Sequence, residues 1–508
     1  MKKVISLLFC FCLAVLMQAQ SIQFHQGDKP NRKAYAPHMI HIAPADQEGL
    51  LLVVEPELKA ISAGNSIGAN SVKDIKVRLC DEEWKDTKSV EIENSKKGLI
   101  LEAFRNGSLL HILLSREESG AFTVRHIALD ANTLEIKSDK AIVTLTLERG
   151  ESGECLTSIS EDGNQIGLAY VLWGKKEPRY ARAALFNRNM EQQWSQSLTY
   201  PNIHEILTTD EGSIATAALG YIKGNSESVF RFNLATATEA KELELSVEED
   251  IERLALLNCK QGRILVTALE GKGGNGVNLL GFTTLGLRRH TGVRSYSIDL
   301  AGGNKYSSHL HEFTKEEICI FDNTAKPSLV ANESTNFLMV RDHCSTKQGG
   351  AVLYQEAWEK EVRNTKNGMT NTTFYSNGML LMQVDMEGNF KQINAIRQRN
   401  QNAKEPMVGS DLFVFNDKLY VVTNESKEAS NEYTTSEPAK LSLSLSLTSA
   451  TNGAVAVYYF TSDGVGAKQM VEKESKSLLF TPLYAVGGGK FYLLTGTLYP
   501  RITSITIP

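Results

Sequence analysis

Two glycine-rich phrases have spacings that enzymes use. Residues 64–68 match the G-x-S-x-G nucleophile elbow around Ser66, and residues 271–276 match the G-x-G-x-x-G phosphate loop. Both motifs need a helix directly after the last glycine. Here 64–68 sits in a small polar loop before the strand-like run 75–79, and 277–282 reads as another strand. The sequence therefore predicts a loop and a hairpin turn, and no catalytic residue.

Histidine and cysteine side chains gather in one part of the chain. His309 and His311 are two residues apart, so on a strand they share a face, and His343 and Cys344 follow later. Imidazole and thiolate are natural ligands for zinc or copper. The two pairs lack a fixed metal-ligand spacing, which favours surface or structural histidines. We predict no metal site and no cofactor.

Paired carboxylates are common, as glycosidases require. Neighbouring residues on a strand face opposite ways, however, so few of these pairs can converge on one bond. Solvated turns explain them better, and Asp385–Gly388 is too short for a helix-loop-helix calcium site. The pairs are Glu82–Glu83, Glu117–Glu118, Glu248–Glu249 and Glu316–Glu317.

The elements around these residues repeat. A polar turn with Gly, Asn or Asp is followed by a short apolar, largely β-branched run eight times, at intervals of 49 to 81 residues. A period of this size is typical of arrays and propellers built from four-stranded blades. The anchors of the eight turns are residues 49, 107, 163, 212, 262, 336, 417 and 489.

A second phrase, a strand ending in an Asp or Asn turn, follows most anchors, as at 77–84, 127–133 and 384–388. Turns of this kind join antiparallel strands. We predict an all-β protein, a β-propeller of seven or eight four-stranded blades with eight the better count, closed into a ring. The last unit lacks a strand, which residues 22–24 or 35–42 are expected to supply. Helix-like spacing occurs only at 247–257 and 354–362.

The first nineteen residues read as a signal peptide, because Lys2 and Lys3 precede an apolar run that ends near Ala19. We predict one propeller domain over 20–508, exported to the periplasm, cell surface or medium, with no transmembrane segment. Removing Lys2 and Lys3 changes the net charge from −5 to −7. This mild acidity, without a basic cluster, argues against nucleic acid as a partner.

The mature chain keeps an odd number of cysteines with irregular spacing, which does not indicate a disulfide framework. Buried free thiols are one interpretation. One disulfide between Cys319 and Cys344 is the other, given an oxidising compartment. The five cysteines are Cys80, Cys155, Cys259, Cys319 and Cys344.

Several of these phrases resemble known bacterial propellers. The run 160–170, SEDGNQIGLAY, is similar to the blade-entry phrase of TolB-like propellers. The segments 379–390, 395–401 and 412–420 resemble the uncharacterised secreted propeller-like proteins of Bacteroidetes. The resemblance implies a fold and an exported location but no activity, because propellers carry many unrelated functions.

Two functions fit this chain. The first is a non-catalytic binding or scaffold protein with a protein, peptide or glycan partner; the second is a secreted hydrolase or lyase acting on polysaccharide, with site residues from several blades. The fifth to seventh units are enlarged within 300–440, and loops commonly carry function. Aromatic and arginine side chains dominate binding surfaces. The predicted binding residues in this region are Tyr306, His309, His311, Tyr354, Trp358, Arg363, Phe374 and Tyr375.

Overall fold

A computed structural model gives the fold of the chain. It describes residues 22–26, 40–45, 49–58, 72–175, 178–199, 203–221, 228–245, 250–260, 262–272, 289–300, 305–321, 335–336, 338–356, 358–364, 369–402, 410–426, 445–446, 449–450, 453–461, 466–472, 478–487, 489–496 and 501–508. Within these residues no helix is long and apolar enough to cross a membrane.

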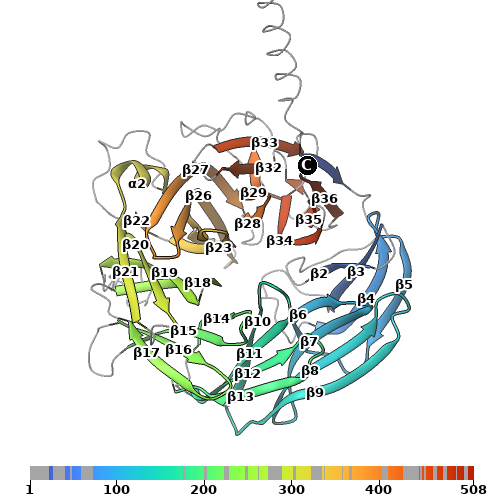
Figure 1. Cartoon of the computed structure of the whole chain (residues 1–508). Coiled ribbons are helices and arrows are strands. Elements are labelled where there is room, and N and C mark those ends of the chain that lie inside the picture. Colours follow the sequence, from blue (N-terminus) through green and yellow to red (C-terminus); the bar gives the residue numbers. More distant parts are fainter. Residues whose placement is uncertain are drawn as a thin grey trace, which may run out of the picture.

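The described strands form eight antiparallel sheets, here called blades 1 to 8 (Figure 1). This number confirms the count of eight. From the innermost strand outward, blade 1 contains β2 (His41–Pro44), β3 (Leu50–Leu58), β4 (Val72–Asp81) and β5 (Asp86–Ile92). In the same order, blade 2 contains β6 (Leu99–Asn106), β7 (Leu109–Glu118), β8 (Ala121–Asp130) and β9 (Ile136–Thr146). Blade 3 contains β10 (Ser152–Ile159), β11 (Gln165–Trp173), β12 (Pro178–Asn187) and β13 (Gln192–Ser197), and blade 4 contains β14 (Glu205–Thr208), β15 (Ile214–Tyr221), β16 (Ser228–Ala235) and β17 (Ala240–Leu245).

Blades 5 and 6 each have a fifth strand, namely β22 beside β20 and β25 beside β26, and blade 8 combines both ends of the chain. A separate two-stranded ladder joins β30 (Leu445–Ser446) to β31 (Ser449–Ala450). Blade 5 contains β18 (Asp250–Lys260), β19 (Arg263–Lys272), β20 (Arg289–Asp299), β21 (Lys305–Glu312) and β22 (Thr335–Asn336). Blade 6 contains β23 (Leu338–Thr346), β24 (Gly349–Glu356), β25 (Trp358–Asn364), β26 (Met369–Asp385) and β27 (Phe390–Asn402). Blade 7 contains β28 (Ser410–Phe415), β29 (Lys418–Ser426), β32 (Gly453–Phe460) and β33 (Gly466–Glu472), and blade 8 contains β34 (Leu478–Gly487), β35 (Lys490–Gly496), β36 (Arg501–Thr506) and β1 (Gln23–Gln26).

Seven of the eight predicted anchors are the turns between the first and second strands of a blade. Gly107, for example, has φ 56°, a left-handed conformation that glycine adopts without strain. The anchor at Asn336 is wrong. It ends β22, which pairs with β20, whereas the turn of blade 6 lies at 347–348 between β23 and β24.

The predicted Asp and Asn turns join the third and fourth strands. Asp81, Asn187 and Asp385 each accept backbone N–H bonds from residues two and four positions later, at 2.8–3.0 Å. Such side-chain bonds offer the backbone a turn in place of a longer strand. Met190, in the turn of Asn187, has φ 61° and is buried against blade 2.

The blades bury both of their faces. In β7, Leu110, Ile112 and Leu114 pack in the cluster shared with blade 1, while Leu113 packs in the cluster shared with blade 3. Alternate residues on a strand point to opposite faces, so a strand between two blades is apolar at every position. The predicted short apolar runs therefore correspond to second strands in the middle of the stack.

The N-terminal strand completes the last blade. β1 pairs with β36 in the register Gln23↔Thr506, and the Ile22 backbone N–H donates to Gln469 Oε1 at 3.0 Å in blade 7. This confirms residues 22–24, rather than 35–42, as the missing strand. Each innermost strand contacts the next one along the chain, and β34 contacts β2. Figure 1 shows the eight sheets arranged around a common centre.

Both helix-like stretches are strands in the structure, because 250–260 forms β18 and 354–362 spans β24 and β25. The described residues contain one helix that the sequence analysis missed, α2 (Lys315–Phe321). Thr314 Oγ1 accepts the Glu317 N–H at 3.2 Å, and the Glu317 carboxylate accepts the Thr314 N–H at 2.8 Å. This reciprocal pair is a capping box, so the T-x-x-E signal was present in the sequence.

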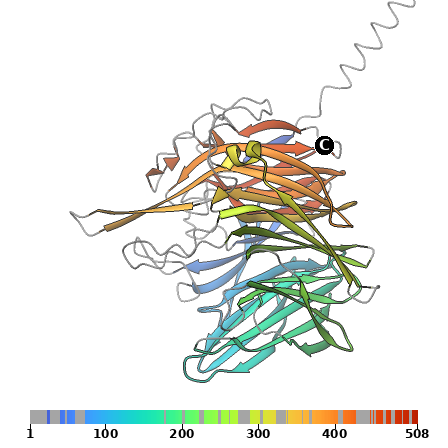
Figure 2. The same cartoon turned by 90° about the vertical axis from the view of Figure 1, so that its left-hand side faces the viewer.

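The enlargement of blade 6 is a hairpin that continues beyond the sheet. β25 pairs with the first half of β26 from Trp358↔Tyr375 to Asn364↔Met369. Figure 2 shows these orange strands projecting from the rest of the molecule. Residues 349–356 do not belong to this extra material, because β24 is a central strand of the blade. We call residues 358–376 the arm.

Candidate functional site

The predicted binding residues are divided among three places. Tyr306, His309 and His311 lie on β21, the outermost strand of blade 5, and Tyr354 lies on β24. The other four, Trp358, Arg363, Phe374 and Tyr375, lie on the arm. In the backbone register of the arm, Trp358 pairs with Tyr375, next to Phe374, whereas Arg363 pairs with Thr370 farther along the hairpin.

The histidines of β21 hold blade 5 against blade 6. His311 Nε2 lies 3.0 Å from Glu317 Oε2, and its ring lies 5.6 Å from that of Phe390 on β27. His309 Cδ2 lies 3.3 Å from the position that a Cβ atom at residue 388 would occupy, so the ring lies against Gly388 of blade 6. Ser297 Oγ also donates to the Met386 carbonyl at 2.6 Å. These contacts give both histidines a structural role.

Tyr354 is a core side chain. It is 0% exposed and packs between blades 5 and 6 with Leu257, Leu380 and Met382. A side chain in this position does not contact a partner at the surface, so Tyr354 belongs to the core and not to a binding face.

The glycine-rich phrases, the possible metal ligands and the cysteines are the other candidate residues of the sequence. Residues 64–68 and 273–276 lie outside the described residues, and no group of three potential metal ligands occurs in the part of the chain that is described. Cys319 and Cys344 are free and pack in different inter-blade clusters, so the disulfide interpretation is wrong. Cys80 and Cys155 are buried free thiols.

The innermost strands of blades 1 and 2 bring His41 and Glu102 together. His41 Nδ1 lies 4.0 Å from Glu102 Oε1, and their side chains are 18% and 30% exposed. The pairing of β6 with β7 shifts register between Ile100 and Glu102, a bulge of the kind that re-aims a side chain. Burial lowers the pKa of His41 to about 4. Burial also raises the pKa of Glu102 to about 7, although the Ala103 N–H bond opposes this shift.

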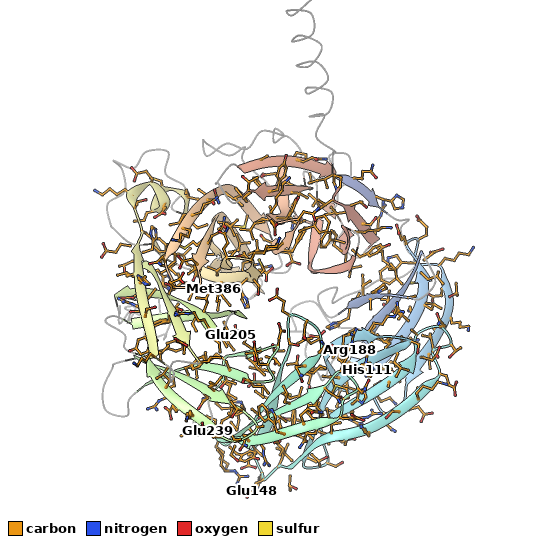
Figure 3. The ribbon with its side chains drawn as sticks, viewed as in Figure 1. His111, Glu148, Arg188, Glu205, Glu239 and Met386 are labelled. Carbon is orange, nitrogen blue, oxygen red and sulfur yellow. The ribbon has the colours of Figure 1, made fainter. Side chains whose placement is uncertain are left out.

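Glu205 begins β14, the innermost strand of blade 4. Figure 3 shows it near the centre of the ring, whereas Glu148 and Glu239 lie at the outer edge. Burial raises the pKa of Glu205 to about 7. Two carboxyl groups of the innermost strands are thus about half protonated near neutral pH. A protonated carboxyl donates a hydrogen bond or a proton, and the ionised form accepts one.

Polar contacts fix these inner strands to one another. Asp342 Oδ2 on β23 accepts the Leu412 N–H of β28 at 2.6 Å, and its Oδ1 accepts the His343 N–H. Thr208 on β14 bonds Ser158 on β10 through both its N–H and its hydroxyl, each at 3.0 Å. These hydrogen bonds join the innermost strands of blades 6 and 7 and of blades 3 and 4. His41 and Glu102 lie beside each other on blades 1 and 2, and Glu205 lies on the innermost strand of blade 4. We call these three residues of innermost strands the central site.

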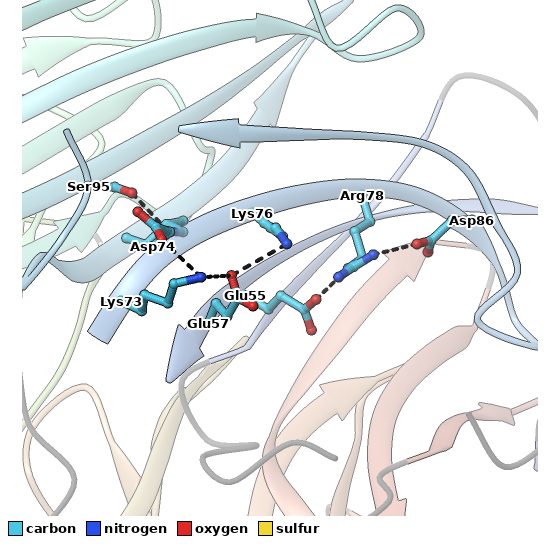
Figure 4. Close-up of polar contacts among 9 residues, drawn as sticks. Glu55, Glu57, Lys73, Asp74, Lys76, Arg78, Asp86 and Ser95 are labelled. Atoms are coloured by element: carbon cyan, nitrogen blue, oxygen red, sulfur yellow. Dashed lines mark hydrogen bonds and ion pairs between the residues drawn. The ribbon is translucent and has the colours of Figure 1, made fainter. Parts of the chain in front are cut away.

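A second polar group covers the face of blade 1 that lies opposite the face packed on blade 2 (Figure 4). Lys73 and Lys76 lie 3.6 and 3.4 Å from Glu57, and Arg78 bonds both Glu55 and Asp86. Burial acts to raise the pKa of Glu57, but the positive charges of Lys76 and Lys73 outweigh burial and lower it. Because every member has an opposite charge beside it, this network suits a structural role.

The sequence analysis missed all three residues of the central site. His41, Glu102 and Glu205 belong to no motif, and their altered pKa values arise from burial in the folded chain. The available signal was their position shortly before the turn anchors at 49, 107 and 212, which places them on first strands.

No family model and no curated protein matches the chain. Among solved structures it is similar to the Dos1 propeller, at 8% identity and TM-score 0.43, over 95% of this chain and 94% of that one. It is also similar to a PL25 ulvan lyase, at 11% identity and TM-score 0.38, over 79% of this chain and 90% of that one. A prolyl endopeptidase is similar at 8% identity and TM-score 0.36, over 94% of this chain and 53% of that one. Likenesses at this level carry no argument about function.

Proposed function

We propose that this chain is an exported binding protein, a closed eight-bladed propeller that holds a glycan at the central site. The observation that supports the proposal is the pair of half-buried carboxyl groups, Glu102 and Glu205, on innermost strands. A carboxyl group that is half protonated near pH 7 both donates and accepts hydrogen bonds, as sugar hydroxyls do. Specific polar groups in an otherwise apolar frame commonly fix ligand orientation.

Membership of the secreted Bacteroidetes propellers remains part of the proposal, together with export of the mature chain. The sequence signals at 1–19 and at 379–390 support both. The arm is the alternative binding place, because it carries four of the predicted binding residues, Trp358, Arg363, Phe374 and Tyr375.

One observation favours a second function, a polysaccharide hydrolase or lyase. General acids in enzymes have carboxyl pKa values raised toward the working pH. Glu102 has such a pKa, and the neutral His41 imidazole beside it is able to accept a proton.

The test is retention of polysaccharides from the native envelope on the immobilised full chain. We expect Glu102→Gln and Glu205→Gln to weaken retention at least about ten-fold, the scale of one lost hydrogen bond to a charged group. Glu239→Gln, at the outer edge, and a chain with residues 357–377 shortened to a tight turn should both retain glycan like the wild type. Loss of retention only in the shortened chain would place the site on the arm.

The same samples distinguish the enzyme from the binding protein. Recovery of intact polysaccharide supports binding. Release of new reducing ends or unsaturated sugars by the wild type but not by Glu102→Gln would overturn the non-catalytic proposal. Equal retention by all variants would overturn the placement at the central site.

A further inference from the structure

Two histidines lie inside the contact between blades 2 and 3. His111 on β7 and His126 on β8 are each 2% exposed, and His111 Nδ1 lies 2.8 Å from His126 Nε2. Their rings are nearly parallel, at 9°, with centroids 5.1 Å apart. Phe122, Phe186 and other apolar side chains of both blades form the cluster on this face. The proposed ligand site uses neither histidine.

This contact depends on at least one neutral ring. A hydrogen bond between two imidazole nitrogens needs one N–H donor and one nitrogen with a free lone pair. If both rings were protonated, two N–H groups would point at each other and no hydrogen bond would form. The outer nitrogens, His111 Nε2 and His126 Nδ1, have no hydrogen-bond partner among the described residues. A proton added to the pair therefore brings a buried charge without a new acceptor.

The charges around the pair oppose protonation. Arg188, in the 187–190 turn of blade 3, faces His111, and Figure 3 shows the two residues close together. Lys140 on β9 also opposes protonation of His126, whereas Asp139, which is paired with Arg125 at 2.6 Å, acts in the opposite direction and raises the pKa of His126. Asn106 joins the blades at this place, because its Nδ2 donates to the Arg188 carbonyl at 3.1 Å.

We propose that the contact between blades 2 and 3 is an acid-sensitive switch, in which proton uptake by the His111–His126 pair loosens the two sheets. Protonated rings favour the open contact over the closed one, because opening the contact lets water solvate each new charge. In the closed state the pair has instead apolar walls and two cations.

The direction of the pH dependence follows from the histidine pKa values. Burial, assisted by Arg188, lowers the pKa of His111 to about 4, and burial with His111 and Lys140 lowers that of His126 to about 4. A solvated histidine titrates near 6.5. The open contact thus binds more protons below pH 6.5, so closure is most stable above pH 6.5 and weakens as the pH falls toward 4.

The experiment is amide hydrogen exchange of the full chain at pH 7.0 and pH 4.5, corrected for intrinsic rates. In the wild type we expect peptides from β7, β8 and the 187–190 turn to open about ten-fold or more at the lower pH, relative to peptides from blade 7. The double variant His111→Asn with His126→Gln places amides at the bonding nitrogens and removes the titration. It should lose this selective opening, whereas the exposed His204→Asn should behave like the wild type.

Uniform opening of all blades, or equal opening in the double variant, would overturn the proposal. Exchange of the imidazole C2 hydrogens in the wild type tests it without any substitution. His111 and His126 are expected to titrate well below 6.5 and to exchange slowly at pH 7. Ordinary titration of both rings would show that the pair is solvated, and would contradict the switch even if the double variant did not fold.

Discussion

The Arg294→Met variant is expected to lose about 3–5 kcal/mol of unfolding free energy, the usual cost of breaking a buried ion pair. Arg294 on β20 and Glu270 on β19 are 6% and 1% exposed, and Arg294 Nη2 donates to Glu270 Oε1 at 3.0 Å. Methionine fills much of the arginine volume but leaves the carboxylate with its main countercharge removed. Denaturant unfolding of the purified chain measures the loss.

Two controls separate burial from charge. The double variant Glu270→Leu with Arg294→Met should recover most of the lost stability, because an apolar pair of similar volume replaces the ion pair. Lys347→Met removes the exposed pair of Lys347 with Asp417, whose atoms lie 2.6 Å apart, and should cost about 1 kcal/mol or less. Wild-type stability of Arg294→Met would show that the pair is solvated.

The Tyr354→Ala variant should also lose about 3–5 kcal/mol, the range for removing a large buried aromatic ring. The ring packs between blades 5 and 6, so its removal leaves a cavity that neighbouring strands fill only in part. Thermal unfolding and denaturant midpoints measure the effect.

Tyr306→Ala is the matched control. Tyr306 is half-buried at the outer strand of blade 5, and we expect a smaller loss of about 1 kcal/mol. If Tyr354→Ala kept full stability but lost glycan retention, Tyr354 would contact the ligand and its place in the core would be wrong.

The blade pattern was predictable because each unit repeats the same local requirements. A left-handed residue in the first turn and an Asp or Asn side chain in the third turn are visible in the sequence near residues 163 and 385. The sixth anchor was missed although Gly349 and Gly350 precede an apolar run at 351–354, as the pattern requires. Asn336 lies just before an apolar run and therefore also matches the pattern of a polar turn followed by a strand.

The helix-like spacing at 247–257 also has a physical cause. β18 shifts register between Glu252 and Leu254 and again between Leu256 and Cys259. Each shift inserts a residue and reverses the parity of the strand, so spacings of three residues interrupt the strict period of two. Local pattern alone therefore cannot distinguish this doubly bulged strand from a helix.

The central site could not be predicted from the sequence for a different reason. The pKa values of His41 and Glu102 depend on contact between the first strands of two blades, and each strand alone is an ordinary half-polar segment. The arm residues were predicted because aromatic side chains cluster in the sequence, and they stay a prediction; the same signal included Tyr354, which packs in the core.

Closure of the ring by β1 is the central claim, because the innermost strands surround one centre only if blade 8 is complete and lies beside blade 1. The register places Gln23 opposite Thr506. We predict that Gln23→Cys with Thr506→Cys forms a disulfide under mild oxidation, seen as a mobility shift on a non-reducing gel, and stabilises the chain by a few kcal/mol. The pair Gln23→Cys with Gln192→Cys, on blade 3, should not cross-link. Failure of the first pair to cross-link in the folded protein, or equal cross-linking of both, would contradict the closed eight-bladed ring.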